Sequence, residues 1–143
     1  MKLGLVSCSL SKDGQEGPAR EVYTSRTFNA RLKLCELTCD RVMILSGKYG
    51  AIDPDRIIFA YETWLRTWSL NSRVSWQAYV LQQVIDEKPS EVVIHAGYHY
   101  YAPFLESGLI GYGAEVTVPT RGMTNLETFS WLKEELDKHD YDQ

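Results

Sequence analysis

Four short apolar runs alternate along the chain with longer segments whose apolar residues recur at helical spacing. The runs are Leu3 to Cys8, Arg41 to Leu45, Glu91 to His95 and Ala114 to Val118. Strands separated by helices build parallel sheets with right-handed crossovers. The alternation therefore predicts one domain over residues 1–143, an α/β three-layer sandwich around a four-stranded parallel sheet. We expect strand order 2-1-3-4, which places a topological switch point between the first and third strands.

The segments between the runs predict helices with one apolar stripe each. The first stripe consists of Phe28, Leu32, Cys35 and Cys39, and the second of Val74, Ala78, Leu81 and Ile85. Two shorter helices are expected where a proline occupies the first helical position, at Asp53-Pro54 and over Ala102 to Ser107. Thr124 to Glu127 matches a capping box, which opens a last helix with its inward face at Leu126, Phe129, Leu132 and Leu136.

Composition excludes several classes of protein. No apolar run approaches the ~20 residues of a membrane helix, and no signal peptide is visible. We therefore expect a cytoplasmic protein that does not associate with a membrane. Three cysteines do not make a disulfide framework, and the cysteines and three histidines lack zinc spacing, so neither metal nor cofactor is expected. The net charge of −4 argues against extensive non-specific binding to nucleic acid, although it permits a local basic groove.

Polar and glycine-bearing loops follow three of the predicted strands. The carboxyl ends of parallel strands meet at one edge of the sheet, so we expect these loops to form one composite site. The loop from Ser46 to Gly50 is either a phosphate-binding loop, with glycines admitting the ligand and Lys48 supplying charge, or a tight turn with a solvated lysine. Lys12, in the loop after the first strand, has the same two interpretations.

Three residues at these strand ends are candidates for catalysis. Cys8 is a nucleophile if a base such as His95 lowers its pKa, and otherwise a small buried residue. His95 either stabilises a developing anion or hydrogen-bonds to the backbone. Asp13 either activates water or is simply solvated.

Aromatic and basic residues offer further contacts to a nucleotide. Tyr61, Trp64 and Trp68 recur at helical spacing, so they either stack on bases or pack in the core or against a partner. A basic cluster surrounds Tyr23 and Phe28 and either holds phosphates or forms a solvated helix face; it comprises Arg20, Arg26, Arg31 and Lys33.

Short motifs in a fixed order extend over nearly the whole chain. They are Val6-Ser7-Cys8 with Lys12, Ala19 to Ser25, Ile44 to Gly50 with Asp53-Pro54, Gly97 with Tyr100-Tyr101, Val118-Pro119 with Gly122, and Trp131-Leu132. In this order the chain resembles the uncharacterised bacterial and phage domains related to YaaA, which are distantly similar to the uracil-DNA-glycosylase superfamily. The resemblance implies a four-stranded parallel sheet and a pocket for a nucleobase. It also implies that Asp13 activates water and His95 stabilises the leaving base.

Together these features predict a domain that recognises a nucleotide, a nucleobase or DNA, and that acts on the glycosidic bond if it is an enzyme. One alternative is a non-catalytic nucleotide sensor or sequestering protein, and another is a transferase that uses Cys8. The oligomeric state stays open, with a homodimer among the options. The expected ligand-binding residues are Ser9, Lys12, Tyr23, Ser46, Gly47, Lys48, Tyr49, Gly97, Tyr100 and Tyr101.

Overall fold

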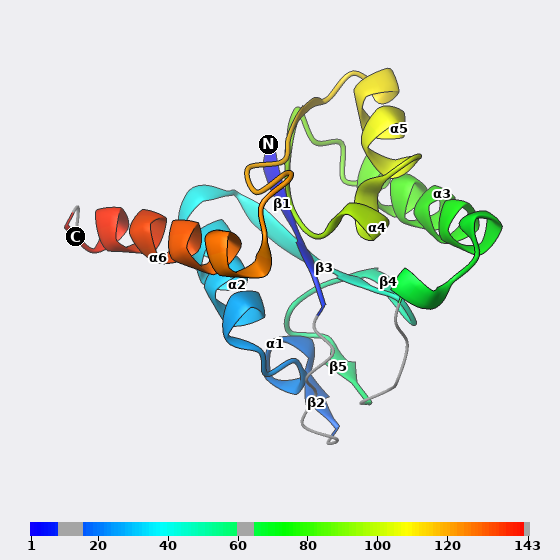
Figure 1. Cartoon of the computed structure of the whole chain (residues 1–143). Helices are drawn as coiled ribbons and strands as arrows, with labels where there is room; N and C mark the ends of the chain where they lie inside the picture. The colour runs from blue at the N-terminus through cyan, green and yellow to red at the C-terminus, as the bar shows by residue number, and fades with distance from the viewer. Residues whose placement is uncertain (9–15, 60–64, 142–143) are drawn as a thin grey trace.

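A five-stranded, mostly parallel sheet forms the centre of the computed structural model, which describes residues 1–8, 16–59 and 65–141 (Figure 1). In sheet order the strands are β4 (Gly50–Ile52), β3 (Arg41–Ser46), β1 (Lys2–Ser7), β6 (Glu91–His95) and β7 (Glu115–Thr117). The four parallel strands follow the predicted order, so the switch point between β1 and β6 is confirmed. The prediction of a four-stranded, wholly parallel sheet is wrong at β4, which pairs antiparallel with β3.

A tight turn after β3 creates the fifth strand. The chain reverses over Gly47 to Tyr49, and Gly50 has φ +79°, a backbone conformation that glycine adopts without strain. The predicted helix at Asp53-Pro54 is wrong. Asp53 Oδ1 instead accepts a hydrogen bond from the Asp55 N–H at 2.9 Å, which makes a local turn. The chain then enters β5 (Ile57–Ile58), which pairs antiparallel with β2 (Gly17–Pro18).

Helices cover both faces of the sheet, as predicted (Figure 1). On one face lie α1 (Ala19–Val22), α2 (Arg26–Thr38) and α6 (Asn125–Tyr141); on the other lie α3 (Leu70–Asp86) and α5 (Leu105–Tyr112). The short helices η1 (Leu65–Thr67) and α4 (Tyr98–Tyr101) lie next to each other on the second face. Alternate strand residues therefore enter two cores: Leu3 and Leu5 pack beneath α3 and α5, and Val6 packs beneath α2.

Two helices bury a face that differs in part from the predicted one, and a third begins later than predicted. In α3 Ala78 is exposed, and the buried stripe runs through Trp76, Val80 and Val84, because β4 and α5 approach the helix from that side. The α6 capping box is confirmed by mutual hydrogen bonds between Thr124 and Glu127. Leu126 is 76% exposed, because it lies about 120° around the helix from the fully buried Leu132. The predicted helix over residues 102–107 begins later, as α5, because a turn occupies residues 102–104.

The fully buried side chain of Gln77 holds the turn between α4 and α5. Its amide oxygen accepts hydrogen bonds from the backbone N–H groups of Phe104 and Leu105, at 2.8 and 2.9 Å. Its amide nitrogen donates to the carbonyl oxygens of His99 and Ala102, at 3.2 and 2.9 Å. One side chain thus bonds four backbone groups from α4 to the first residue of α5, and this holds the turn between the two helices in place.

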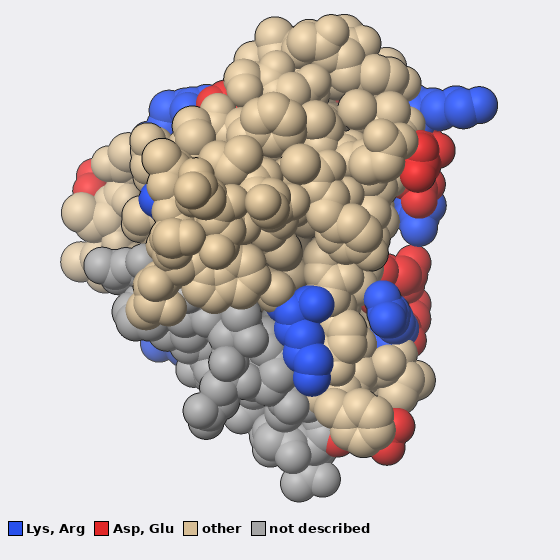
Figure 2. Space-filling view, turned by 90° about the vertical axis from the view of Figure 1, so that its right-hand side faces the viewer, with Lys and Arg blue, Asp and Glu red and all other residues tan. Residues whose placement is uncertain are grey.

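Few charged side chains appear on the face covered by α3 and α5 (Figure 2). Large apolar side chains exposed on these helices are Leu70, Tyr79, Ile110 and Tyr112. Whether this face pairs with a second copy of the chain in a homodimer stays a prediction.

Within the part of the chain that the structure describes, no helix combines the length and apolar character needed to cross a bilayer.

We predict that Gln77→Ala lowers the free energy of unfolding by about 3 kcal/mol, because four backbone groups at the edge of the core lose their bond to the Gln77 amide. Urea denaturation measures the loss. Gln82→Ala in the same helix is the matched control, since its amide bonds only the exposed Asp86 in the turn below; we expect it to change stability by less than about 0.5 kcal/mol. Equal losses in the two variants would contradict the role of Gln77.

Two glycine-to-alanine substitutions are expected to act with opposite signs. A Cβ on Gly4 would lie 2.8 Å from the Cys35 Sγ and 3.1 Å from the Cys39 Sγ, so Gly4→Ala overpacks the core and costs about 1–3 kcal/mol. A Cβ on Gly111, in α5, would meet nothing within 4 Å. Gly111→Ala therefore stabilises by up to about 1 kcal/mol through helix propensity. Thermal unfolding of both variants tests the contrast, which fails if Gly4→Ala is neutral.

Candidate functional site

A pocket of about 420 Å³ opens where β1, β6 and β7 end, between α2, α4 and the start of α6. We call it the Arg31 pocket, after the most buried charged group in its wall. Its wall combines small, aromatic and hydrogen-bonding side chains: Arg31, Ala96, Gly97, Tyr98, Tyr101, Thr120, Arg121, Gly122, Met123, Asn125 and Thr128. The position at the carboxyl edge, beside the switch point, is the one where α/β sheets bind ligands.

Arg31 extends from α2 toward the end of β1 and is largely buried. One terminal nitrogen, Nη1, donates a hydrogen bond to Ser7 Oγ at 3.1 Å. The buried Nε has no hydrogen-bond partner among the described residues, and no described carboxylate forms an ion pair with Arg31. Burial lowers the pKa of the guanidinium, but arginine is protonated in proteins at any ordinary pH. The pocket therefore contains a desolvated positive charge without a counter-ion among these residues.

The opposite rim is formed by aromatic rings and a second arginine. Tyr98 and Tyr101 follow β6, with their ring centres 5.9 Å apart and their planes nearly perpendicular. Tyr98 is 62% exposed, whereas Tyr101 is buried. Arg121 lies 5.3 Å from the centre of the Tyr101 ring and forms an ion pair with Glu106. The rim thus offers an exposed flat ring and a cation that is already neutralised.

Cys8 and Tyr100 connect the ends of β1 and β6. The Cys8 Sγ and the Tyr100 hydroxyl are 3.3 Å apart, which brings the end of β1 next to the segment after β6; the loop that follows Cys8 lies outside the described residues. The Tyr100 ring packs edge-on against Trp76, and the indole N–H of Trp76 donates to the Ser46 carbonyl at 2.9 Å. Burial, together with Cys8, raises the pKa of Tyr100 far above its usual value, so this hydroxyl remains protonated.

His95 lies beneath α6 and faces a different cavity. It lines a volume of about 210 Å³ together with Leu34, Glu91 and Trp131, and its ring centre lies 6.1 Å from that of Trp131. Burial lowers the pKa of His95 to about 4, and the nearby charges of Arg31 and Lys2 act in the same direction. His95 is therefore neutral at physiological pH. Its buried Nδ1 has no hydrogen-bond partner within the described ranges.

The structure brings only part of the predicted site together. Gly97 and Tyr101 line the Arg31 pocket, and Tyr100 lies next to it on Cys8. Tyr23 is buried and packs on Phe28, with ring centres 5.3 Å apart. Predicted residues that lie outside the described residues are Ser9, Lys12 and Asp13, as are Tyr61 and Trp64; Trp68 is half-buried against the α3 core.

The predicted loop from Ser46 to Gly50 lies at the β3–β4 turn and does not line the Arg31 pocket. The Ser46 hydroxyl accepts hydrogen bonds from the backbone N–H groups of Lys48 and Tyr49, at 3.3 and 3.0 Å. Lys48 lies over the Tyr49 ring, 5.3 Å from its centre, and Gly47 is buried. In this geometry the backbone N–H groups that a phosphate would need already donate to the Ser46 hydroxyl within the turn.

Sequence reasoning placed Arg31 only within a general basic cluster and did not name Arg121, Thr120 or Asn125 as binding residues. A signal for Arg31 was present, because it stands one turn from Phe28 and Cys35 on the apolar stripe of α2. A charged residue on a buried face needs a partner. The other cluster members point elsewhere: Arg20 bonds Asp55 and Glu36, and Arg26 lies 4.5 Å from the centre of the Phe129 ring.

No group of three or more histidine, cysteine or acidic side chains that suits a metal ion is found in residues 1–8, 16–59 and 65–141. The Arg31 pocket instead offers guanidinium, hydroxyl and amide groups. These groups donate hydrogen bonds to anions and to the edges of bases.

We predict that His95 makes the folded protein less stable at acid pH. Above pH 6.5 it is neutral in both the folded and the unfolded chain; below this value the unfolded chain gains a proton that the folded chain accepts only near pH 4. Stability therefore falls as the pH drops through this window, by about 3 kcal/mol from this group. Urea denaturation at pH 7 and pH 4.5 should show a smaller drop for His95→Leu than for the wild type. Identical drops would show that His95 titrates normally.

One solved structure supports the fold, and none of the comparisons names an activity. The solved structure of AF0587, a protein of unknown function, superposes with a TM-score of 0.54 at 19% identity. The match covers 95% of this chain and 44% of AF0587, so the chain spans less than half the length of that protein. No curated protein matches the chain. A family model matches residues 3–134, and the chain therefore belongs to the family of unknown function DUF6884.

Proposed function

We propose that the Arg31 pocket binds a nucleotide, with the phosphate at Arg31 and the base at the tyrosine rim. The observation that carries the proposal is the buried guanidinium of Arg31, which has a single hydrogen bond to Ser7 and no carboxylate partner among the described residues. An unpaired charge is costly to bury, so a site that buries one gains by receiving an ion of opposite sign. A phosphate matches the planar donor face of a guanidinium.

The remaining wall suits a nucleobase. Tyr98 presents an exposed ring, and a base stacked on an aromatic ring gains about 1–3 kcal/mol. Thr120, Asn125 and Thr128 provide hydroxyl and amide groups for the polar edge of a base. The volume of about 420 Å³ lies in the range of small-molecule sites, about 300–1,000 Å³. A mononucleotide is therefore favoured over a long duplex, in keeping with the net charge of −4.

Binding without chemistry is the function that the described residues support best. His95, expected to stabilise a leaving base, faces the cavity beneath Trp131, and Asp13 lies outside the described residues. Cys8 is 8% exposed and contacts Tyr100. Cleavage of the glycosidic bond, the alternative from the family resemblance, stays a proposal that is tested by incubating the protein with nucleotides and DNA and measuring released base.

We predict that Arg31→Gln weakens nucleoside monophosphate binding about tenfold to hundredfold, the value of one charged hydrogen bond at about 1.5–3 kcal/mol. Titration calorimetry with the four common monophosphates, their nucleosides and inorganic phosphate measures this loss. The control is Lys33→Gln, which removes the same charge from the exposed face of the same helix and should leave affinity unchanged. The proposal fails if the wild type binds none of these compounds or if both variants bind equally.

A second readout separates loss of the anion from loss of the fold. We expect phosphate to raise the Tm of the wild type and of Lys33→Gln but not that of Arg31→Gln. Without ligand, Arg31→Gln should be at least as stable as the wild type, because it removes a desolvated charge. Strong destabilisation of this variant would mean that Arg31 serves the fold.

A further inference from the structure

Two cysteines at the end of α2 rest on the same point of β1. Cys35 lies in the last turn of the helix, Cys39 is the residue that ends it, and the Cys39 N–H donates to the Cys35 carbonyl at 2.8 Å. A Cβ built on Gly4 would lie 2.8 Å from one sulfur and 3.1 Å from the other. Both sulfurs therefore occupy the space left by the missing side chain of Gly4, and this brings them next to each other.

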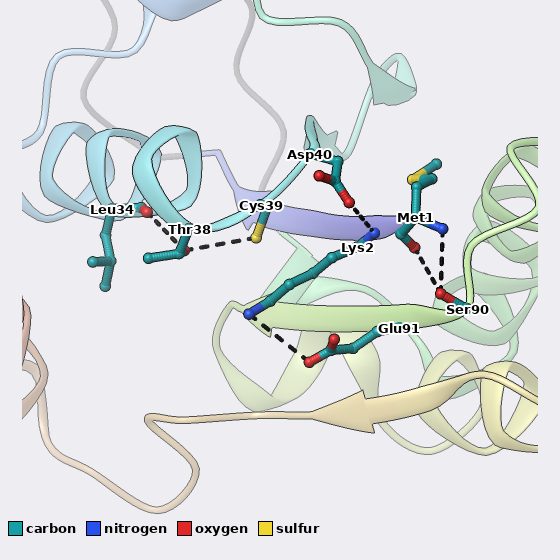
Figure 3. Close-up of polar contacts among 8 residues, drawn as sticks. All are labelled: Met1, Lys2, Leu34, Thr38, Cys39, Asp40, Ser90 and Glu91. Atoms are coloured by element: carbon teal, nitrogen blue, oxygen red, sulfur yellow. Dashed lines mark hydrogen bonds and ion pairs between the residues drawn. The ribbon is translucent and has the colours of Figure 1, made fainter.

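The two thiols differ in access. Cys35 is fully buried in the α2 core. Cys39 is partly exposed and lines a cavity of about 300 Å³ at the amino edge of the sheet, on the opposite side from the Arg31 pocket. Figure 3 shows Cys39 beside Thr38, whose hydroxyl oxygen is 3.7 Å from the Cys39 Sγ, with Lys2 and Asp40 around it. Of the two thiols, only Cys39 is therefore accessible from the surface.

The contact between the two thiols shifts their pKa values in opposite directions. A hydrogen bond from Cys35, opposed by burial, lowers the pKa of Cys39 to about 7. The same hydrogen bond and burial raise the pKa of Cys35 well above its usual value. Thiols whose pKa is near the ambient pH attack disulfides fastest, because thiolate fraction and nucleophilicity are then balanced.

The end of the helix allows the sulfurs to join. Residues four apart on a helix have Cβ atoms about 5–6 Å apart, whereas a disulfide needs about 3.5–4.5 Å. Cys39 already has extended backbone angles, φ −121° and ψ 156°. Movement of Cys39 toward Cys35 therefore affects the hydrogen bond from its own N–H at the end of α2 and leaves the earlier turns of the helix intact.

We propose that Cys35 and Cys39 form a thiol–disulfide exchange site, in which Cys39 attacks a small-molecule disulfide and Cys35 resolves the product. First, the Cys39 thiolate bonds to one sulfur of the disulfide and displaces the other as a thiolate. The released thiolate takes the proton of Cys35. The Cys35 sulfur then bonds to the Cys39 Sγ and displaces the second half of the reagent as a thiolate. The protein loses two electrons, and the disulfide is reduced to two thiols, one of them ionised.

The charges around the cavity select the class of reagent. Four carboxylates and two guanidinium groups line it, from Glu36, Asp40, Asp53, Asp55, Arg20 and Arg41. Both arginines are paired with acidic residues, so the excess charge is negative. A disulfide carrying ammonium groups is therefore the preferred substrate.

The test uses the reduced full-length chain, cystamine as the cationic disulfide, and mass spectrometry with peptide mapping. We expect the wild type to pass through a mixed disulfide on Cys39 and to end as a Cys35–Cys39 disulfide without retained cysteamine. Cys35→Ser should keep the cysteamine adduct on Cys39, and Cys39→Ser should leave Cys35 unmodified. A stable adduct on wild-type Cys39, or equally fast reaction of Cys35 in Cys39→Ser, overturns the proposal.

Two measurements on the wild type need no substitution. Alkylation of Cys39 by iodoacetamide should follow a titration with a midpoint near pH 7, and Cys8 should remain unmodified over the same time. Cystamine should react faster than the dianionic dithiodiglycolate at low salt, and added salt should narrow the difference. An alkylation midpoint above pH 8.5, as for an ordinary thiol, or faster reaction with the dianion, contradicts the assignment.

Discussion

The buried amide of Gln77 is the interaction on which the geometry beyond β6 depends. At the carboxyl edge of the sheet, where ligands bind, a strand is followed by loops and turns. Such backbone is stable when buried only if its N–H and C=O groups form hydrogen bonds. Gln77 bonds two groups in the turn, at Ala102 and Phe104, and one in each helix that flanks it, at His99 and Leu105. Because Tyr98 and Tyr101 belong to the same segment, a residue of α3 on one face of the sheet determines how the pocket rim is presented at its edge.

Helix α2 carries both unusual groups of this chain, one toward each edge of the sheet. Arg31 reaches the carboxyl edge beside Ser7, and Cys35 with Cys39 lies toward the amino edge over Gly4. The helix packs on β1 between these points. β1 accommodates it through two small residues, a serine hydroxyl that accepts from the guanidinium and a glycine that leaves room for two sulfurs. The candidate anion site and the candidate exchange site thus share a strand and a helix while opening on opposite sides.

Local patterns were sufficient for much of the fold. Helices on both faces and the capping box of α6 were predicted, because alternation and caps act over a few residues. The order of the four parallel strands was expected from a rule of topology, the switch point, rather than from a local pattern. Strand β4 was missed, since three residues after a tight turn carry no pattern that separates a strand from a loop. The buried face of α3 differs in part from the predicted one. The side of a helix that becomes buried depends on the elements that pack against it, here β4 and α5.

For the site, the sequence alone pointed to the carboxyl edge of the sheet and to Gly97 and Tyr101, because parallel strands bring their ends together whatever their side chains. It left the Ser46 to Gly50 loop, His95 and Arg31 with open roles. Only the tertiary structure distinguishes their roles. The turn after β3 bonds its own N–H groups to Ser46, and His95 lies under Trp131. Arg31, in contrast, contributes a desolvated charge to the pocket. The position of Arg31 on the apolar stripe of α2 was a local sign that it is buried. Which groups surround Arg31, His95 and the turn depends on residues distant in the chain, so no local pattern contains those contacts.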